Sequence, residues 1–292
     1  MRVSDTMLFT NSLQDSRRSR AAVLDSQQKL SSGLRVTAPS EDTSAYIKAK
    51  RLDDALKTSE AYLENIARAQ SNLQTSEGVL GEANNILSRV KELAVQMANG
   101  VHEANGRAAA ALEVVELRGT LIQIGNTKIG EEYLFAGNLT DTVPFDSAGV
   151  YHGDSNQRMV EVGSGLKVAT NISGDTVFNA AGGVDVFAML SDLETQLNNN
   201  DPDAIAALLD DVDIAINQVI SGRSDLGNYI NTAQVAESVV NRLNEDLSTE
   251  KSRLIDTDIM DSSSKMALNS QALEASLAAI SRVMNISLIN RL

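Results

Sequence analysis

Apolar and small residues recur along residues 45–97 in alternating steps of four and three, which places them on one face of a helix. One slip interrupts the alternation between Leu73 and Ser76, and slips of this kind locally overwind a coiled coil. The pattern predicts a long helix from Ser44 to Ala98, in which Gly78 and Gly81 are the weak points. The inward positions are Ala45, Ala49, Leu52, Leu56, Ser59, Leu63, Ile66, Gln70, Leu73, Ser76, Leu80, Ala83, Leu87, Val90, Ala94 and Met97.

Breaks in the periodicity separate this helix from others. The sequence NGVHEANG at residues 99–106 predicts a helix stop and a new start, so residues 107–128 are expected to return antiparallel to the first helix. A second seam of apolar residues predicts a long helix over residues 224–255. The stretch DTDIMDSSS then precedes a last helical segment with a weak seven-residue spacing, and the first thirty residues likewise end at a break that contains Pro39.

The middle of the chain differs in kind. Nine of the 18 glycines lie between Gly130 and Gly183, and six of the ten aromatic residues lie between Tyr133 and Phe187. The runs YLFAG, QRMVEVG and LKVATNI are short, alternating or β-branched, and bounded by turn residues, which predicts short antiparallel strands. Two amphipathic helices are expected after them, and Asp201 is the expected N-cap of the second, ahead of Pro202.

These elements predict a mainly α protein with a small β insert. Long antiparallel helices from both ends of the chain are expected to form an elongated rod, with a central β-rich domain between them. Small and polar residues occupy half of the inward positions of the last segment, so that helix is expected to be barely stable alone. The simplest way for both segments to bury their seams is to pair with each other or with neighbouring subunits.

Composition and charge narrow the possible functions. Aromatic residues make up only 3% of the 292 residues and tryptophan is absent, so a compact core of the kind found in enzymes is poorly supplied. A net charge of −14 argues against partners such as nucleic acid or an anionic membrane. The basic cluster Arg17, Arg18 and Arg20 is interpreted as a solvated helix face. With no cysteine, disulfides and thiolate chemistry are excluded. No secretory signal and no apolar run of membrane-spanning length is expected.

Candidate chemical sites are few, and we expect no catalytic residue, metal site or cofactor. His102 and His152 lie in different segments, which leaves too few ligands for a zinc or iron site. The run Gly163–Gly165 lacks the flanking lysine and the serine or threonine of a phosphate-binding loop, and it is interpreted as a turn between strands. We interpret one acidic group as a solvated helix face, namely Asp210, Asp211 and Asp213. We interpret the other, Asp256 and Asp258, as capping carboxylates at a helix break.

Three motifs carry a resemblance to a known family. The sequence LSSGLRVTAPSED at residues 30–42, followed by the long helix, resembles the N-terminal signature of the bacterial flagellin family. ALEASLAAISRVMNI and SLINRL resemble the C-terminal end of that family. Residues 131–165 are similar to the hook-associated protein 3 branch, the hook-filament junction proteins, through the pattern FAG, PF and Y.GD. The resemblance covers nearly the whole chain.

The resemblance implies a domain organisation. Residues 1–32 and 257–292 would be terminal helices of an inner coiled-coil layer, disordered in the monomer and folding on assembly. Residues 33–43 would be a linker, 44–132 and 223–256 the two parts of a helical rod domain, and 133–222 the central insert with its two helices. The expected inward contacts of the inner layer are Leu24, Leu30, Met266, Leu273, Leu277, Ile280, Met284 and Leu288.

The resemblance also implies a function and partners. The chain would be an extracellular subunit of the flagellum, exported through the flagellar type III apparatus, that forms a ring or layer with copies of itself. Its other partners would be a hook-side hook-associated protein, flagellin, and an export chaperone that binds the C-terminal helix. Flagellin itself, the filament subunit, is the alternative. An enzyme or ligand-binding module in the β insert is a third, much weaker hypothesis, because no convergent titratable groups can be assembled there.

The two breaks suggest a mechanical hypothesis. Joining two tubes that bend differently requires joints between an inner layer and a stiffer outer rod. We therefore expect residues 31–43 and 255–264 to act as such joints, with Gly33 and Pro39 setting the geometry of the first.

Overall fold

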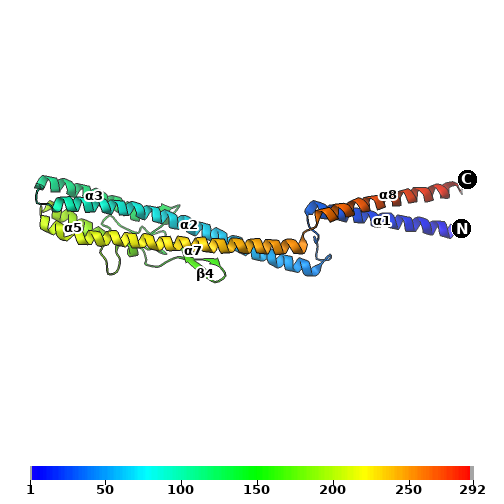
Figure 1. The fold of residues 1–292 in the computed structure, drawn as a ribbon, viewed down its shortest axis with the longest axis horizontal. Coiled ribbons are helices and arrows are strands. Elements are labelled where there is room, and N and C mark those ends of the chain that lie inside the picture. The colour runs from blue at the N-terminus through cyan, green and yellow to red at the C-terminus, as the bar shows by residue number, and fades with distance from the viewer. Residues whose placement is uncertain (1, 290–292) are drawn as a thin grey trace. The chain divides into compact units, whose positions relative to one another are not determined.

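The computed structural model describes residues 2–289, and within them the side chains of Met7, of residues 10–282 and of Met284. The chain divides into two compact units. The terminal unit consists of the chain up to Thr58 and from Leu243 onward, and the central unit is Ser59–Arg242. The helices are α1 (Arg2–Ser32), α2 (Thr43–Ala98), α3 (Ala104–Gly125), α4 (Gly174–Phe178), α5 (Val186–Asn198), α6 (Pro202–Ala207), α7 (Leu209–Ile255) and α8 (Ile259–Ile289) (Figure 1).

Helix α2 follows the predicted seam closely. It begins at Thr43, where Asp42 Oδ1 accepts a hydrogen bond from the Ala45 N–H at 2.9 Å and so caps the first turn. The inward positions from Leu73 to Met97 are buried, and neither Gly78 nor Gly81 interrupts the helix. Tertiary packing therefore outweighs the low helix propensity of the two glycines.

Helix α7 corrects the prediction that a new helix starts near residue 224. It runs without a break from Leu209 through Gly222 to Ile255, so no new helix begins at residue 224. A Cβ at Gly222 would lie 3.0 Å from Val177 Cγ2 and 3.4 Å from Ile172 Cδ1. Glycine at this position therefore permits close packing inside the helix and does not end it.

Smaller corrections concern the ends of other helices. Helix α3 begins at Ala104 and ends at Gly125, where the sequence pattern predicted 107–128. The helix expected from residue 202 is divided into α6 and the start of α7. The predicted N-cap of α6 is confirmed, because Asp201 Oδ1 accepts a hydrogen bond from the Ala204 N–H at 3.0 Å.

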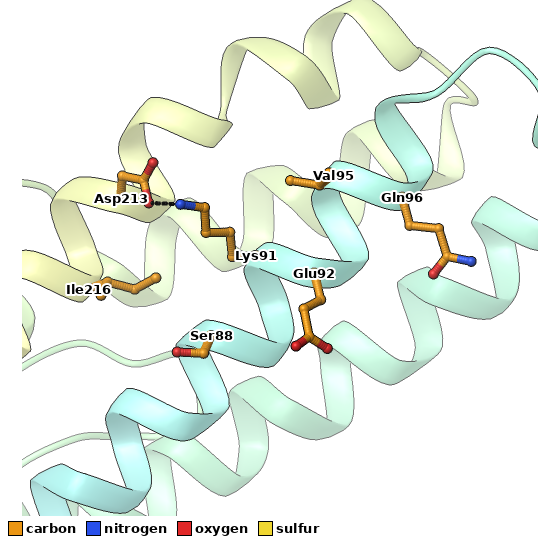
Figure 2. Close-up of a pocket in the computed structure, with 7 residues that line it drawn as sticks. All are labelled: Ser88, Lys91, Glu92, Val95, Gln96, Asp213 and Ile216. Atoms are coloured by element: carbon orange, nitrogen blue, oxygen red, sulfur yellow. Dashed lines mark hydrogen bonds and ion pairs between the residues drawn. The ribbon is translucent and has the colours of Figure 1, made fainter.

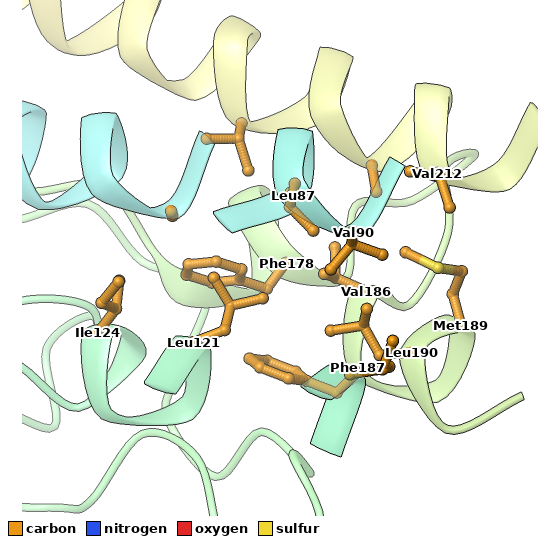
Figure 3. Packing of buried hydrophobic residues seen from close by; sticks show 14 of the residues in the cluster. Leu87, Val90, Leu121, Ile124, Phe178, Val186, Phe187, Met189, Leu190 and Val212 are labelled. Carbon is orange, nitrogen blue, oxygen red and sulfur yellow. The ribbon is translucent and has the colours of Figure 1, made fainter. Parts of the chain in front are cut away.

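The main hydrophobic core lies in the central unit, where α2, α3, α5 and α7 meet the residues of the insert. An aromatic cluster fills its centre: Phe178 lies 5.4 Å from Phe145 and 6.2 Å from Phe135, both in edge-to-face geometry. Figure 3 shows Phe178 and Phe187 among the aliphatic side chains of the surrounding helices. The four aromatic side chains that are buried among the described residues all belong to this cluster: Phe135, Phe145, Phe178 and Phe187.

The β structure of the insert is confirmed as small. Strand β1 (Lys128–Ile129) pairs antiparallel with β2 (Glu132–Tyr133), and β3 (Met159–Gly163) pairs with β4 (Leu166–Ala169). Gly165, at φ +75°, forms the turn between β3 and β4, as expected for the glycines at residues 163–165. The run YLFAG is different from its prediction, because only Tyr133 lies in a strand and the next three residues are buried in a loop.

Candidate assembly interface

Helices α1 and α8 of the terminal unit pack side by side along their length (Figure 1). A polar contact fixes their register: Asn269 Nδ2 in α8 donates hydrogen bonds to Ser26 Oγ at 2.8 Å and to the Ala22 carbonyl at 3.3 Å in α1. Ser26 is buried in this contact. Because a buried amide without partners is costly, a shift of one helix along the other would lose both hydrogen bonds. The pair is therefore held in one register although its apolar seam is weak.

The two breaks in the helical pattern pair with each other. The Arg35 N–H donates to the Ile255 carbonyl at 2.6 Å, and the Thr257 N–H donates to the Gly33 carbonyl at 2.9 Å. These bonds flank an antiparallel bridge between Leu34 and Asp256. We call this pairing of residues 33–36 with residues 254–257 the linker contact. It connects the segment after α1 to the segment before α8 through backbone hydrogen bonds.

Gly33 ends α1 in a left-handed conformation. Its φ is +72°, and its N–H donates to the Lys29 carbonyl at 2.9 Å, which satisfies a carbonyl of the last helical turn. The same residue also accepts the hydrogen bond from Thr257. Glycine at this position therefore serves both the end of α1 and the linker contact.

We expect Gly33→Ala to lower the free energy of unfolding by about 1 kcal/mol, because a residue with a Cβ is strained in this conformation. Gly119→Ala is the matched control: it lies inside α3, and at both glycines no atom stands within 4 Å of an added Cβ. The control should raise the free energy of unfolding by about 0.5–1 kcal/mol. Equal effects of the two variants in chemical denaturation would contradict the assigned geometry.

Charged side chains of the first break hold its turn together. One oxygen of the Glu41 carboxylate accepts hydrogen bonds from the Thr37 N–H at 2.6 Å and the Ala38 N–H at 3.2 Å. Its other oxygen lies 3.4 Å from Lys29 Nζ, which also donates to Asp25 at 3.0 Å. The backbone hydrogen bond from Thr37, supported by that from Ala38, lowers the pKa of Glu41 below its usual value, and the hydrogen bond to Asp25 raises the pKa of Lys29.

The lowered pKa of Glu41 predicts weakening of this turn in acid. A carboxyl whose folded pKa lies below its unfolded value contributes its full stability above the unfolded value, and loses it as the pH falls through the folded value. We expect the Thr37 amide resonance to titrate with a midpoint below the usual pKa of glutamate. Glu41→Gln keeps an acceptor oxygen but has no titrating charge, so it should abolish this transition; an unchanged transition would assign it to another carboxyl.

A small apolar core supports the linker contact. It consists of Val36, Ala45, Ala49 and Ile255, with Leu34, Tyr46 and Leu254 packed against it. An ion pair at 2.6 Å between Lys251 Nζ and Asp53 joins α7 to α2 beside this core, and its hydrogen bond lowers the pKa of Asp53. Asp258 caps α8 by accepting hydrogen bonds from the Met260 N–H at 2.8 Å and the Asp261 N–H at 3.2 Å, as the capped-break interpretation expected.

The N-terminal and C-terminal parts of the chain both match models of known protein families. The model of the bacterial flagellin N-terminal helical region matches residues 3–140, and that of the C-terminal helical region matches residues 209–292. Together the two matches cover well over half of the chain. The protein belongs to the bacterial flagellin family.

The flagellin-family chain is similar over its full length to curated relatives. It is 26% identical to flagellar hook-associated protein 3 of Escherichia coli over 312 aligned positions, which span 99% of this chain and 98% of that protein. It is 28% identical to flagellin of Bacillus subtilis, over 95% of each chain. Hook-associated protein 3 and flagellin, the branch indicated by the central motif and its alternative, are therefore both represented among its relatives.

Solved structures share its fold. A protein from Vibrio parahaemolyticus described as a putative flagellar hook-associated protein aligns with a TM-score of 0.70 at 21% identity, covering 74% of this chain and all of that one. The flagellar junction protein FlgL from Legionella pneumophila aligns with a TM-score of 0.59 at 20% identity, covering 71% and 99%. At these identities the likeness establishes the fold alone. It confirms the flagellin-like, mainly α architecture with its small β insert.

The residues expected to make inward contacts fall into two groups. Leu30, Met266, Leu273 and Ile280 are half-buried. Leu24, Leu277 and Met284 remain 57%, 52% and 49% exposed. The side chain of Leu288 lies outside the described residues. Since Leu277 and Met284 are seven residues apart, they share one face of α8, and that face carries apolar side chains that α1 does not cover.

The structure also shows exposed apolar side chains that the heptad pattern missed. They are Met7 in α1 and Ile259, Met260 and Leu268 in α8. The first two residues of α8 stand at the capped start of the helix, where no heptad could be assigned, and Leu268 does not share the seven-residue spacing. A count of large apolar residues without regard to spacing would have identified them. We call the exposed set of Met7, Leu24, Ile259, Met260, Leu268, Leu277 and Met284 the exposed apolar set.

The residues assigned to the first joint are placed in ordered turns. Gly33 ends α1, and the Pro39 carbonyl accepts a hydrogen bond from Thr43 Oγ1 at 2.8 Å. The segment between them is held by Glu41 and by the linker contact. Bending at this point would thus break specific hydrogen bonds, so the hinge function of Gly33 and Pro39 stays a prediction.

Residues of the central motif form a cluster of hydrogen bonds in the insert. The Tyr151 hydroxyl donates to the Phe135 carbonyl at 2.9 Å or to the Asp154 carbonyl at 2.8 Å and lies 3.0 Å from Ser173 Oγ. Burial raises the pKa of this hydroxyl. A Cβ at Gly137 would overlap Asp154, and one at Gly153 would overlap Tyr151. The glycines of the FAG and Y.GD sequences therefore allow two loops of the insert to pack closely against each other.

The described part of the chain offers no assembled chemical site. A shallow surface groove lies between α2 and α7, and Figure 2 shows the Lys91–Asp213 ion pair that crosses it at 2.6 Å. His152 Nε2 lies 3.2 Å from Asp146 Oδ2. The other histidine, His102, belongs to a different segment of the chain. Among the described residues, no three metal-binding side chains gather, and no helix has both the length and the apolar character to cross a bilayer. Arg17, Arg18 and Arg20 are exposed on α1.

Proposed function

We propose that this chain is a structural subunit of the bacterial flagellum that joins the hook to the filament. The observation that carries the proposal is the end-to-end match to hook-associated protein 3 of Escherichia coli and of Salmonella typhimurium, each over 99% of this chain and 98% of the relative. The match includes the central residues as well as the helical ends.

Assembly would proceed through the terminal unit. The exposed apolar set on α1 and α8 is the surface that neighbouring copies would cover, because burial of apolar area drives most protein association. Each copy carries a net charge of −14, so association needs an apolar contact strong enough to oppose repulsion between copies. The inferred product is a ring or layer of this chain, bounded by a hook-associated protein on one side and by flagellin on the other.

Further parts of the proposal concern export. The chain would leave the cell through the flagellar type III apparatus and act outside the cell in the flagellum. An export chaperone would bind α8 as an amphipathic helix in a groove, which would cover the same apolar side chains until assembly. The chain would have no catalytic function.

Flagellin, the filament subunit, is the second candidate, and the 28% identity to the Bacillus subtilis flagellin over 95% of each chain favours it. The two candidates differ in how far they polymerise. A junction subunit should add a limited layer to purified hooks, whereas flagellin should extend long filaments from the same seeds.

Complementation tests the proposal. The gene for this chain should restore swimming to a strain that lacks hook-associated protein 3 and should fail in a strain that lacks flagellin. Electron microscopy should then show filaments attached to hooks in the first strain. Rescue of the flagellin-deficient strain alone would reject the junction function in favour of the filament function.

A further inference from the structure

The turn between α2 and α3 contains an asparagine followed by a glycine. Asn99 and Gly100 are both exposed, and they lie outside either helix. Among the hydrogen bonds of the described residues, none uses the Gly100 N–H, whereas the Asn99 carbonyl accepts one from Arg107 Nη2 at 3.0 Å and one from the His102 N–H at 3.3 Å. No atom lies within 4 Å of the position of a Cβ on Gly100. The Gly100 nitrogen is therefore unhindered and free to react.

The Arg107 side chain beside this turn is a buried cation without an anionic partner. Its guanidinium donates to the carbonyls of Met97 at 2.9 Å and Asn99, and to Asn200 Oδ1 at 2.5 Å. All three acceptors are neutral, and no carboxylate of the described residues forms an ion pair with it. The C-terminal end of α2 offers only partial negative charge. A buried guanidinium with neutral partners alone leaves a favourable place for a carboxylate.

We propose that Asn99 is a site of spontaneous deamidation, and that the isoaspartate it forms supplies the missing carboxylate to Arg107. The Gly100 nitrogen attacks the Asn99 side-chain carbonyl carbon, a new C–N bond closes a succinimide ring, and ammonia leaves. Water then adds to the former main-chain carbonyl of Asn99 and opens the ring. The main chain now passes through the side-chain carbon, and the former main-chain carbonyl becomes a free carboxylate. The balance is one water consumed, one ammonia released and one negative charge gained.

The geometry explains why this product suits the site. The carbonyl that becomes the carboxylate is the one that already accepts a hydrogen bond from Arg107 Nη2. The neutral hydrogen bond is thereby replaced by a charge-assisted one, and Arg presents its donors in a fork that fits a carboxylate. The extra backbone atom falls in an exposed turn, where insertions are tolerated.

A second asparagine-glycine pair provides an internal control. Asn105 and Gly106 are exposed in the same way, but they lie in the first turn of α3, and the Gly106 N–H donates to the Glu103 carbonyl at 3.0 Å. Ring closure there would break this hydrogen bond and distort the start of the helix. The two sites share their sequence and exposure, so they differ only in backbone structure.

Peptide mapping of the full-length protein tests the site. After incubation at mildly alkaline pH, mass spectrometry with fragmentation that separates isoaspartate from aspartate should find conversion at residue 99, mainly to isoaspartate, and none at residue 105. In urea both sites should convert at similar rates. Equal conversion at the two sites in the folded protein would overturn the proposal, and so would conversion at residue 99 in urea alone.

Two alanine variants isolate the chemistry from the fold. Gly100→Ala should slow conversion at residue 99 without loss of stability, because nothing lies within 4 Å of the added Cβ. Gly106→Ala is the matched control and should leave conversion at residue 99 unchanged. Slowing by the second variant as strong as by the first would overturn the assignment to the local turn.

The pairing with Arg107 has its own test, which needs no change at this buried residue. Anion exchange separates the aged protein from the fresh protein by the added charge, and thermal unfolding of both is then measured at low and high salt. The aged form should unfold at a higher temperature than the fresh form at low salt, and salt should reduce this difference. An equal or lower unfolding temperature at low salt would overturn the pairing; the lower value is the one expected for one more unpaired negative charge on this acidic chain.

Discussion

Leu277→Asp should abolish incorporation of this chain into the flagellum while leaving the monomer folded. Leu277 is 52% exposed on α8, so the new carboxylate stays in water in the free chain, and the free energy of unfolding should change by less than about 0.5 kcal/mol. In the assembled layer the same carboxylate would be buried against apolar side chains, where an unpaired charge costs several kcal/mol. A pelleting assay on purified hooks, with denaturation of the monomer alongside, measures both effects.

Leu277→Met is the matched control, because it keeps an apolar side chain of similar volume and should assemble normally. Ile280→Asp should also block assembly, but it changes a half-buried residue on the seam with α1 and should lower the stability of that pair as well. Normal swimming of a strain that carries Leu277→Asp would contradict the assembly function of the exposed apolar set.

Phe178→Ala should lower the free energy of unfolding by about 3–5 kcal/mol, the range for removing a buried aromatic ring. The Phe178 side chain is fully buried and contacts Phe135, Phe145 and Phe187, so its loss leaves a cavity and removes three ring contacts. Chemical denaturation of the full chain gives this value directly. The midpoint of unfolding of the central unit should fall accordingly.

Leu139→Ala provides the comparison for this variant, because Leu139 belongs to the same unit but is 46% exposed. Its effect should stay within about 0.5 kcal/mol. Phe178→Ala should still assemble at temperatures where it is folded, since the exposed apolar set lies in the terminal unit. A cost below about 1 kcal/mol would indicate that the aromatic cluster is not a rigid core.

The sequence predicted the helices well where their apolar spacing was regular. The seam of α2 was read correctly, because repeated steps of three and four leave few alternatives. The helix start predicted near residue 224 was wrong, because the sequence does not show that the preceding Gly222 allows close packing against Val177 inside a continuous helix. The loop at residues 134–136 was misread as a strand, because burial of apolar residues does not require strand pairing.

For the assembly surface, the sequence identified the right helices but could not sort their residues. The heptad pattern predicted that Leu273 and Leu277 both make inward contacts. In the structure Leu273 is half-buried, whereas Leu277 is exposed. Side chains on neighbouring positions of one seam differ in burial according to where the single partner helix lies. That placement depends on the Asn269–Ser26 contact, which no spacing rule indicated.

The sequence by itself determined that this is a mainly helical protein of the flagellin type, with two weak terminal helices set off by breaks, because periodicity and turn residues act locally. Tertiary structure alone decided that the two breaks pair with each other and that Arg107 is buried without an anion among the described residues. These features join residues that are distant in sequence or remove a charge from water. Such effects depend on which groups the fold brings together, and no local pattern records them.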